Sequence, residues 1–521
     1  MKKWIRLSLC LACAHGPAAP AAELLWQDFD SVPTGSIANV SGWTRAIWLG
    51  GITARVDSVG AYASPSNVLQ LFRHAAAAAA VFTNFDSVYS TNEHPVIRCS
   101  AKLVAPTNVF FQIGLRNSTD GAFLSFQSTN GYGGLGFLAH DRILFPLVGN
   151  RFADLAFFYN RSNNSYRLDY DYTNRIPWIT NSEGGATVAR FNQFVVARPG
   201  FSTNTVPLLV DDVSVETFPP HVWAWWRCAA EPQARFVEQL GTFPPALRAS
   251  HADDARAGSS DPVWDGRGDV HNAGATRQLA AGPASCALAI PASTNWTVEA
   301  VFRMPSTAQN AALLDWGRDT GSTATGAWIS VGYNANGYVN LDLRDAQQAD
   351  ATYASLALRH FTPNGRWQHM AVVKSNATVT LYVDYQFVTN RVLTGPADGS
   401  YAFGAGSRAA IGKTLAGSNP CDADTLIDEV RVSGKALAFA EFLQPGQPLI
   451  VDIDDLPADS TWALTLKGIR GKSYRVETSP SLGSDARWQF ATNHVAAYTF
   501  DFIDVPGTGS TTHFVRVIRE D

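Results

Sequence analysis

The stretch GRWQHMAVV at residues 365–373, followed by LYVD at 381–384 and LIDEVRV at 426–432, decides the fold of this chain. In each segment apolar and polar residues alternate, which is the pattern of a β-strand with one face in a core and the other in water. The three segments therefore predict an antiparallel β-structure that buries one side of each strand.

The order and the amino-acid sequences of these segments resemble those of the laminin-G-like, concanavalin-type jelly-roll domains of secreted proteins. The resemblance covers the middle of the chain, where NWTVEAVF at 295–302 opens the series of strands. It implies a jelly-roll β-sandwich, and this fold hosts both binding proteins and enzymes. The fold alone therefore leaves the function open.

The composition bounds the class of protein. The chain has 521 residues, too many for one core, so two or three domains are expected. Aromatic residues make up 11% and charged residues 16%, which is typical of a globular chain and not of a disordered one. The formal net charge is −5 and no basic run is present, which argues against nucleic acid or anionic lipid as a partner.

We predict an all-β protein with two tandem concanavalin-like jelly-roll β-sandwiches and a small C-terminal β-sandwich. Pro219-Pro220 and the segment QPGQP at 444–448 mark the two linkers. Residues 229–281 carry few strand signals, and we expect a lid or an ordered surface loop there. The expected parts are a signal peptide at 1–22, an N-terminal jelly roll at 23–218, a laminin-G-like jelly roll at 221–444 and the C-terminal sandwich at 447–521.

The N-terminus has the pattern of an export signal. Residues 1–6 are basic, residues 7–14 are apolar but too short to span a bilayer, and Ala19-Pro20-Ala21 fits a signal-peptidase site. Cleavage near Ala21 or Ala22 predicts a protein that is secreted, periplasmic or held at the cell surface. The alternative is a lipoprotein modified at Cys13, which follows Leu11 and Ala12.

Cysteine usage agrees with export. Four cysteines remain after the expected cleavage, and an oxidising compartment permits a disulfide among them. The pairing cannot be read from sequence, but we favour Cys286 with Cys421 because each lies beside a strand of the middle domain. No Cys-x-x-Cys pair or Cys/His cluster occurs, which argues against a zinc site.

Glycoside hydrolysis needs two carboxylates that face each other across a substrate. On a strand this usually reads Glu-x-Asp-x-x-Glu or Glu-x-Asp-x-Glu, and neither motif is present in the sequence. The nearest clusters are DIDD at 452–455 and DAD at 422–424, and we expect both in loops. Asp428 and Glu429 are adjacent, so a strand would place them on opposite faces. Gly-x-Ser-x-Gly is also missing, and we predict no catalytic residues.

Calcium is the expected ion, because jelly rolls offer it carboxylates and carbonyl oxygens at loops near the sheet edge. In the first domain, first and last strands that lie side by side would bring their aspartates together. Adjacent aspartates on a strand point in opposite directions, so only one of Asp211 and Asp212 could be a ligand. The alternative is that these carboxylates cap turns. The candidate ligands are Asp28, Asp30 and Asp211 in the first domain, and Asp265, Asp269 and Asp428 in the second.

Sugar binding uses exposed aromatic faces together with polar side chains that bond hydroxyl groups. The densest group is WAWW at 223–226, where strand period puts Trp223 and Trp225 on one face and Trp226 on the other. We expect these residues in a core. Aromatic residues flanked by Gly, Asn or Asp are better ligand candidates, and these are Trp264, Tyr333, Tyr338 and Tyr132.

The combined pattern favours an exported, non-catalytic recognition protein that binds polysaccharide or glycoconjugate through its jelly rolls. The alternative is a structural or adhesive surface protein that makes protein contacts, including contacts with cell-surface proteins. A glycoside hydrolase comes third.

Overall fold

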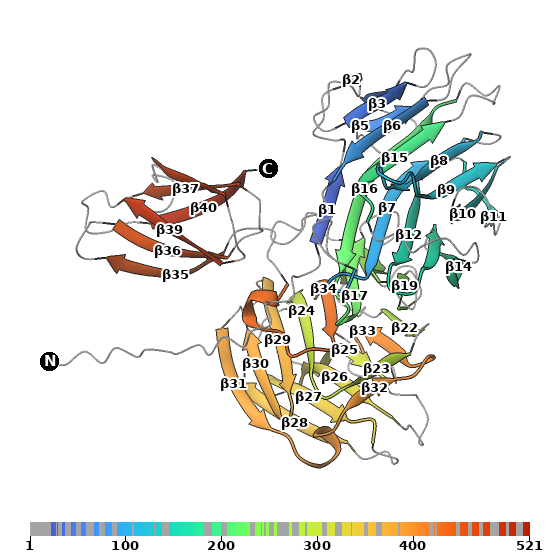
Figure 1. The fold of residues 1–521 in the computed structure, drawn as a ribbon. Coiled ribbons are helices and arrows are strands. Elements are labelled where there is room, and N and C mark those ends of the chain that lie inside the picture. The colour runs from blue at the N-terminus through green and yellow to red at the C-terminus, as the bar shows by residue number, and fades with distance from the viewer. Residues whose placement is uncertain are drawn as a thin grey trace. The chain divides into compact units, whose positions relative to one another are not determined.

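In a computed structural model of the protein, the chain divides into two compact units, Met1–Pro220 and His221–Asp521. The architecture is nearly all β, as predicted, with strands arranged in layered antiparallel sheets (Figure 1). The structure describes residues 22–27, 29, 34–36, 43–47, 54–58, 67–71, 79–85, 91–106, 109–129, 131–137, 145–149, 151–171, 173–181, 190–198, 206–229, 235–240, 242–243, 246–248, 255–257, 270–272, 281–286, 289–304, 310–317, 326–334, 336–347, 353–360, 367–383, 386–415, 421, 425–443, 449–456, 461–467, 473–479, 489–495, 500–506 and 514–520.

The first unit is a two-sheet sandwich. One sheet has the order β14 (Thr173–Thr180), β13 (Ser165–Tyr170), β12 (Ala153–Asn160), β7 (Val96–Val104), β16 (Leu208–Phe218), β5 (Asn67–Leu71), β4 (Ala54–Ser58) and β2 (Gly35–Ser36), with β1 (Ala22–Gln27) also paired to β16. The other has the order β11 (Phe145–Pro146), β10 (Tyr132–Phe137), β9 (Phe123–Thr129), β8 (Phe111–Arg116), β15 (Gln193–Arg198), β6 (Ala79–Asn84) and β3 (Trp43–Ile47).

Alternation along these strands builds the core of the first unit. Ile113 on β8, Phe126 on β9 and Val196 on β15 are fully buried and belong to one apolar cluster with Phe157 of the other sheet. Such burial on one face of each sheet is the expected result of period-2 patterning.

The second unit contains a larger sandwich, in which Trp226, Trp296 and Trp316 are fully buried within one core. We call its larger layer the ten-stranded sheet. Its order is β19 (Ala246–Arg248), β18 (Arg235–Glu238), β17 (Val222–Ala229), β34 (Leu426–Ser433), β24 (Trp296–Arg303), β29 (Trp367–Ser375), β30 (Thr378–Val383) and β31 (Gln386–Val392). In addition, β21 (Val270–Asn272) pairs with β34, and β20 (Ala255–Ala257) pairs with β21.

The facing layer of this sandwich is the six-stranded sheet. Its order is β22 (Ala281–Ser285), β33 (Arg408–Ile411), β25 (Ala311–Trp316), β26 (Trp328–Tyr333), β27 (Tyr338–Arg344) and β28 (Ala354–His360). The same sandwich also has a two-stranded sheet of β23 (Ile290–Ser293) and β32 (Tyr401–Phe403) and the short 3-10 helices η2 (Gly395–Ala397) and η3 (Phe439–Glu441).

The segment 229–281 differs from the prediction. Four short strands, β18 to β21, lie within it and extend the ten-stranded sheet. Each has only three or four residues, which is too short for an alternating pattern to stand out in the sequence. The lid or surface loop expected from the sequence is therefore corrected to sheet-forming chain in these stretches.

The C-terminal residues form two three-stranded sheets. One has the order β35 (Leu449–Leu456), β36 (Thr461–Lys467) and β39 (Phe500–Pro506), and the other has β38 (Gln489–Val495), β37 (Ser473–Ser479) and β40 (Phe514–Glu520). Ile503 of the first sheet shares a small apolar cluster with Tyr474 and Val476 of the second. No helix among the described residues is long and apolar enough to cross a membrane.

Candidate functional site

Strand β27 presents a row of polar and aromatic side chains on the outer face of the six-stranded sheet. Tyr338 is 38% exposed, and Asn340 and Asp342, at alternate positions, are half-buried. Alternate residues of a strand share a face, so these three side chains lie on the same side. The intervening residues are fully buried in the core, and these are Val339, Leu341 and Leu343. We call the outward row of Tyr338, Asn340 and Asp342 the open face.

Small residues flank Asn340 and Asp342 on both sides, whereas Tyr338 lies opposite His360 of β28. Asn340 lies opposite Gly332 of β26 and Ala357 of β28. Asp342 lies opposite Ser330 and Ser355 in the same two strands. Because these neighbours are short, the amide and the carboxylate stand above them and are within reach of a ligand laid on the sheet.

The two polar side chains of the open face already contact each other. Asn340 Nδ2 donates to Asp342 Oδ1 at 3.1 Å. This bond fixes the amide orientation, so that Asn340 Oδ1 remains as an acceptor and Asp342 Oδ2 as a second one. The row therefore combines an aromatic face with hydrogen-bonding groups, which is the combination that recognises sugar rings.

The far end of the row is closed by aromatic packing. Trp328 lies opposite Arg344 and packs edge-on against Tyr353, with ring centroids 5.0 Å apart and an interplanar angle of 75°. Trp328 Nε1 also donates to the buried carboxylate of Asp315, whose second oxygen accepts from Leu415 N at 2.8 Å. Tyr353 itself is 47% exposed, so it offers a second aromatic surface.

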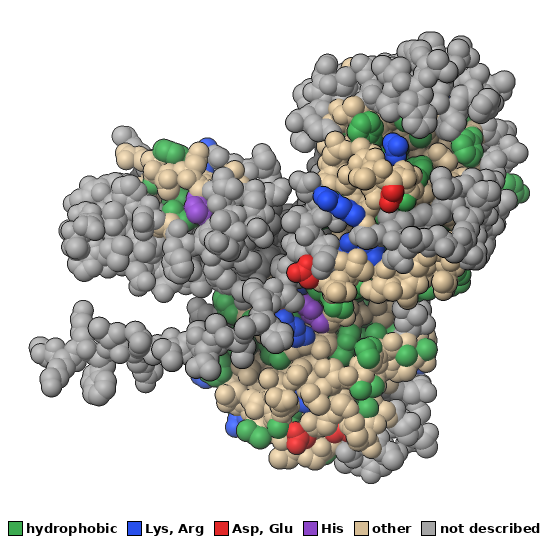
Figure 2. Space-filling view, viewed as in Figure 1, with side chains coloured by type: hydrophobic (Ala, Val, Ile, Leu, Met, Phe, Trp, Pro, Cys, Tyr) green, Lys and Arg blue, Asp and Glu red, His purple; other side chains and the backbone are tan. Residues whose placement is uncertain are grey.

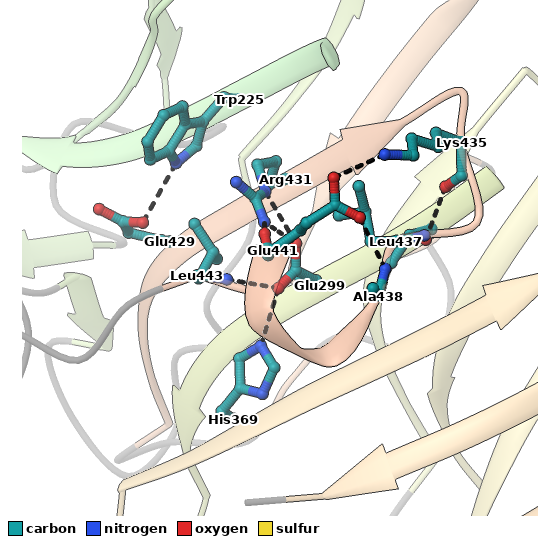
Figure 3. Close-up of polar contacts among 11 residues, drawn as sticks. Trp225, Glu299, His369, Glu429, Arg431, Lys435, Leu437, Ala438, Glu441 and Leu443 are labelled. Carbon is teal, nitrogen blue, oxygen red and sulfur yellow. Dashed lines mark hydrogen bonds and ion pairs between the residues drawn. The ribbon is translucent and has the colours of Figure 1, made fainter. Parts of the chain in front are cut away.

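The outer face of the ten-stranded sheet is organised differently. Glu299 on β24, His369 on β29 and Arg431 on β34 lie side by side and are all buried (Figure 3). Glu299 Oε1 accepts from His369 Nε2 at 3.0 Å and from Leu443 N at 2.7 Å. Its other oxygen, Oε2, accepts from Arg431 Nε at 2.7 Å and also from Nη2. We call these three residues the sealed cluster.

A segment from distant sequence covers this cluster. Residues 434–443, which we call the strap, include η3 and are held by the hydroxyl of Thr297. That hydroxyl donates to Lys435 O at 2.8 Å and accepts from Leu437 N at 3.0 Å. Phe442 of the strap packs on His369 with ring centroids 5.6 Å apart, and Glu299 and His369 are fully buried.

The charge of Glu299 is matched within the cluster. Burial alone would raise the pKa of this carboxyl group, but Arg431, His369 and the Leu443 N–H lower it to about 2. With both oxygens occupied and no exposed surface, Glu299 has no position for a substrate. The sealed cluster is therefore a structural clamp for the strap and not a pair of catalytic carboxylates.

The structure separates the tyrosines predicted to bind ligand. Tyr338 and Tyr132 are exposed, at 38% and 49%, at the first positions of β27 and β10. The prediction is wrong for Tyr333, which is 3% exposed within β26 and packs against Phe302 in the core. Trp264 lies outside the described residues.

The predicted calcium ligands lie mostly outside the described residues. This holds for Asp28, Asp30, Asp265 and Asp269, and for the side chain of Asp428. The two strands expected to be neighbours are paired, with Gln27 of β1 opposite Val213 of β16. Among the described residues, no group of three or more His, Cys, Asp or Glu side chains is arranged to hold a metal.

Around Asp211 the backbone departs from a regular strand. Asp212 has a φ of 47°, and the β16–β7 register shifts between Asp211 and Ser214. The simple rule that adjacent aspartates point in opposite directions therefore does not apply at this bulge. Asp211 Oδ1 accepts from Asp212 N at 2.9 Å, and Lys102 Nζ lies 2.7 Å from Asp212 Oδ2. The ammonium group thus supplies a positive charge at this position.

The predicted disulfide is wrong in this structure. Cys286 and Cys421 are both buried thiols. Cys286 N donates to Ser407 O, just before β33, whereas Cys421 N donates to Gly412 O, just after it. Residues 407 and 412 of an extended strand are about 16 Å apart. The two cysteines therefore lie at opposite ends of β33, too far apart for a disulfide bond.

The tryptophans at 223–226 are buried, but their faces differ from the prediction. A register shift between Val222 and Ala224 lets both Trp223 and Trp226 enter the core. Trp225 takes the opposite face, where its Nε1 donates to Glu429 at 3.1 Å and its ring contacts the guanidinium of Arg227 at 4.0 Å. A bulge of this kind has no signal in the alternation of the sequence.

The sequence interpretation missed Asn340, Asp342 and Tyr353. A signal existed for two of them, because the segment YVNLDLR of β27 alternates strictly and places Asn340 and Asp342 on the face of Tyr338. Tyr353 had no such signal, since its position depends on Trp328 in a different strand. On the face shown in Figure 2, the described basic and acidic side chains are scattered and do not form one patch.

Comparison with known proteins identifies the fold of part of the second unit. Residues 275–441 match the family described as the concanavalin A-like lectin/glucanases superfamily, under the heading Laminin_G_3. This confirms the laminin-G-like fold predicted for the middle of the chain. No curated protein sequence matches the chain.

Several solved structures are similar in part. A sialidase is 11% identical, with 38% of this chain and 18% of that chain covered and a TM-score of 0.29. Domains LG4-5 of the mouse laminin α1 chain are 13% identical over 66% of this chain and 88% of theirs, with a TM-score of 0.23. CBM40 of the Ruminococcus gnavus IT-sialidase, bound to α2,3-sialyllactose, is 12% identical over 31% and 93%, also with a TM-score of 0.23. At this level of similarity they assign no ligand to the chain.

Proposed function

We propose that this is an exported, non-catalytic protein that recognises glycans through the open face of its second unit. The observation that carries the proposal is the row of Tyr338, Asn340 and Asp342 on one exposed strand. The tyrosine ring offers a stacking surface for the apolar side of a sugar, and the amide and carboxylate oxygens accept hydrogen bonds from its hydroxyl groups. Short side chains on both neighbouring strands leave room for a sugar beside Asn340 and Asp342.

A glycan-array screen with the full chain tests this function. We expect selective binding that weakens about three- to tenfold in Tyr338→Ala, the range given by loss of one aromatic contact. Phe387→Ala is the matched control, because Phe387 is 61% exposed on β31 of the other sheet. Equal loss in both variants, or none in either, would contradict a site at the open face.

Calcium in the first unit is a separate proposal. The pairing of β1 with β16 supports it, because β1 ends at Gln27, which lies opposite Val213, the residue after Asp212. Repeating thermal unfolding with calcium and then with chelator tests it, since an ion bound only by the folded state raises the unfolding temperature. An unchanged unfolding temperature would remove the ion from the proposal.

A second function, adhesion to another protein, is favoured by strand β31. Phe387 and Val392 are 61% and 73% exposed, and they lie opposite Tyr382 and Thr378 on the outer face of the ten-stranded sheet. Exposed apolar residues on an edge strand are a typical contact surface. A blank glycan array together with cell or protein binding that is lost in Phe387→Ala would favour adhesion over glycan recognition.

A further inference from the structure

Two exposed tyrosines, Tyr338 on β27 and Tyr353 just before β28, lie at opposite ends of one row of side chains. Tyr338 begins β27, and Tyr353 packs on Trp328, which lies opposite Arg344 at the end of β27. Six residues of extended strand separate positions 338 and 344, a span of about 20 Å. A single sugar ring cannot contact both aromatic surfaces across such a span, whereas an extended oligosaccharide laid along the strand can.

The accessible charge along β27 in this row is the carboxylate of Asp342, because Arg344 on the same face is buried. Asp342 is half-buried near its middle and is held by Asn340, which donates to Oδ1 at 3.1 Å. Arg344 on the same face is only 2% exposed, and its Nε donates to Gly326 O at 2.7 Å. Arg359 on β28 is exposed, but its Nη1 is directed to Val388 O of β31, at 3.4 Å, and so toward the edge of the sheet.

These charges decide between classes of glycan. A carboxylate or sulfate on the ligand would meet the Asp342 carboxylate at short range, and like charges in a partly buried site disfavour binding. A neutral hydroxyl or an amino group would instead donate a hydrogen bond to the same oxygen. Selectivity would therefore come from a repulsive group as well as from attractive contacts.

We infer that the open face binds an extended glycan chain without acidic groups, laid along β27 from Tyr338 to Tyr353. This inference rests on the proposed glycan-binding function and adds its ligand class and the second aromatic contact. Tyr338 and Tyr353 contact sugar rings at the two ends, and Asn340 and Asp342 accept hydrogen bonds between them.

The test uses three series of oligosaccharides from two to six residues: neutral cello-oligosaccharides and manno-oligosaccharides, amino-bearing chitosan oligosaccharides, and acidic oligogalacturonides. Binding to the full chain is measured by calorimetry. We expect affinity for a neutral or amino-bearing series to rise with length. Tyr353→Ala should lower the affinity about three- to tenfold for the longer members and leave the affinity of the shorter ones unchanged. Asp342→Asn should improve binding of the acidic series several-fold while leaving the fold unchanged by circular dichroism.

Two results would overturn the inference while leaving glycan recognition in place. The first is preferential binding of the acidic series by the unmodified chain. The second is affinity that is independent of length and insensitive to Tyr353→Ala. Absence of binding in all series would instead overturn the proposed function, and the inference with it. Phe387→Ala, which lies on the other sheet, should bind every series as the unmodified chain does.

Discussion

The second unit has two outer faces, and each carries polar residues at alternate strand positions. On the ten-stranded sheet these residues are Glu299, His369 and Arg431, with exposures of 0%, 0% and 3%. On the six-stranded sheet the corresponding row starts at Tyr338, which is 38% exposed, and continues through half-buried side chains. The same alternating pattern thus produces the buried sealed cluster on one face and the accessible open face on the other. The difference arises from coverage, because only the first face lies under the strap.

The largest expected effect comes from breaking the sealed cluster at its centre. Glu299→Gln leaves the buried Arg431 guanidinium without its counter-charge, and we expect the free energy of unfolding to fall by about 3–5 kcal/mol. Urea unfolding followed by tryptophan fluorescence measures it. Lys435→Met is the matched control, because its ion pair with Glu441 is 38% exposed on the lysine side and should contribute less than about 1 kcal/mol. Equal effects of the two variants would contradict a sealed face.

Acid should weaken the same cluster without any mutation. The pKa of Glu299 is about 2 in the folded protein and has a reference value of 4.5. A lowered pKa stabilises the fold above the unfolded value, and this stabilisation is lost as the pH falls from about 4.5 towards 2, at most about 3 kcal/mol in total. Unfolding measured across this range should show a slope that Glu299→Gln reduces. A slope identical in the two proteins would assign the acid sensitivity to other carboxyl groups.

A smaller effect is expected where the strap is attached. Thr297→Val keeps the shape of the side chain but removes the hydroxyl that bonds both Lys435 O and Leu437 N. The buried N–H of Leu437 and the partly buried carbonyl of Lys435 would lose their partner, and we expect the free energy of unfolding to fall by about 1–3 kcal/mol. Hydrogen exchange should show faster exchange of the Leu437 amide in this variant. Unchanged exchange at Leu437 would indicate that other bonds hold the strap, such as those from Leu443 N to Glu299 and from Arg431 to Glu441 O.

Substitutions at the open face should hardly change the free energy of unfolding. Asn340→Ala removes a half-buried side chain whose partner, Asp342, remains accessible to water, and we expect a change within about 0.5 kcal/mol. The same variant should weaken binding of a responsive glycan from the array, as measured by calorimetry. A loss of stability similar to that of Thr297→Val would mean that polar residues of both faces contribute to stability, against the expected difference between the faces.

Alternation in the sequence predicted the strands and much of the core, because strand period is a local property of residues i and i+2. It identified the strand at 426–432, whereas Tyr338 was chosen as a ligand candidate from its flanking glycine and not from alternation. It failed where backbone irregularity changes the period, as at the bulge that brings Trp223 and Trp226 into one core. The flanking glycine and asparagine were misleading for Tyr333, because they indicated a loop although the residue ends a buried strand.

By itself, the sequence determined that this protein is all β, that its middle part is laminin-G-like, and that Tyr338 could be exposed. The tertiary structure decided which polar residues are sealed, since Glu299 is covered by Leu443, 144 positions away. It also separated Cys286 from Cys421 at the two ends of β33, and brought Tyr353 against Trp328. The physical reason is that the choice of face follows from local geometry, whereas burial and neighbourhood depend on segments that are distant in the chain and meet only in the fold.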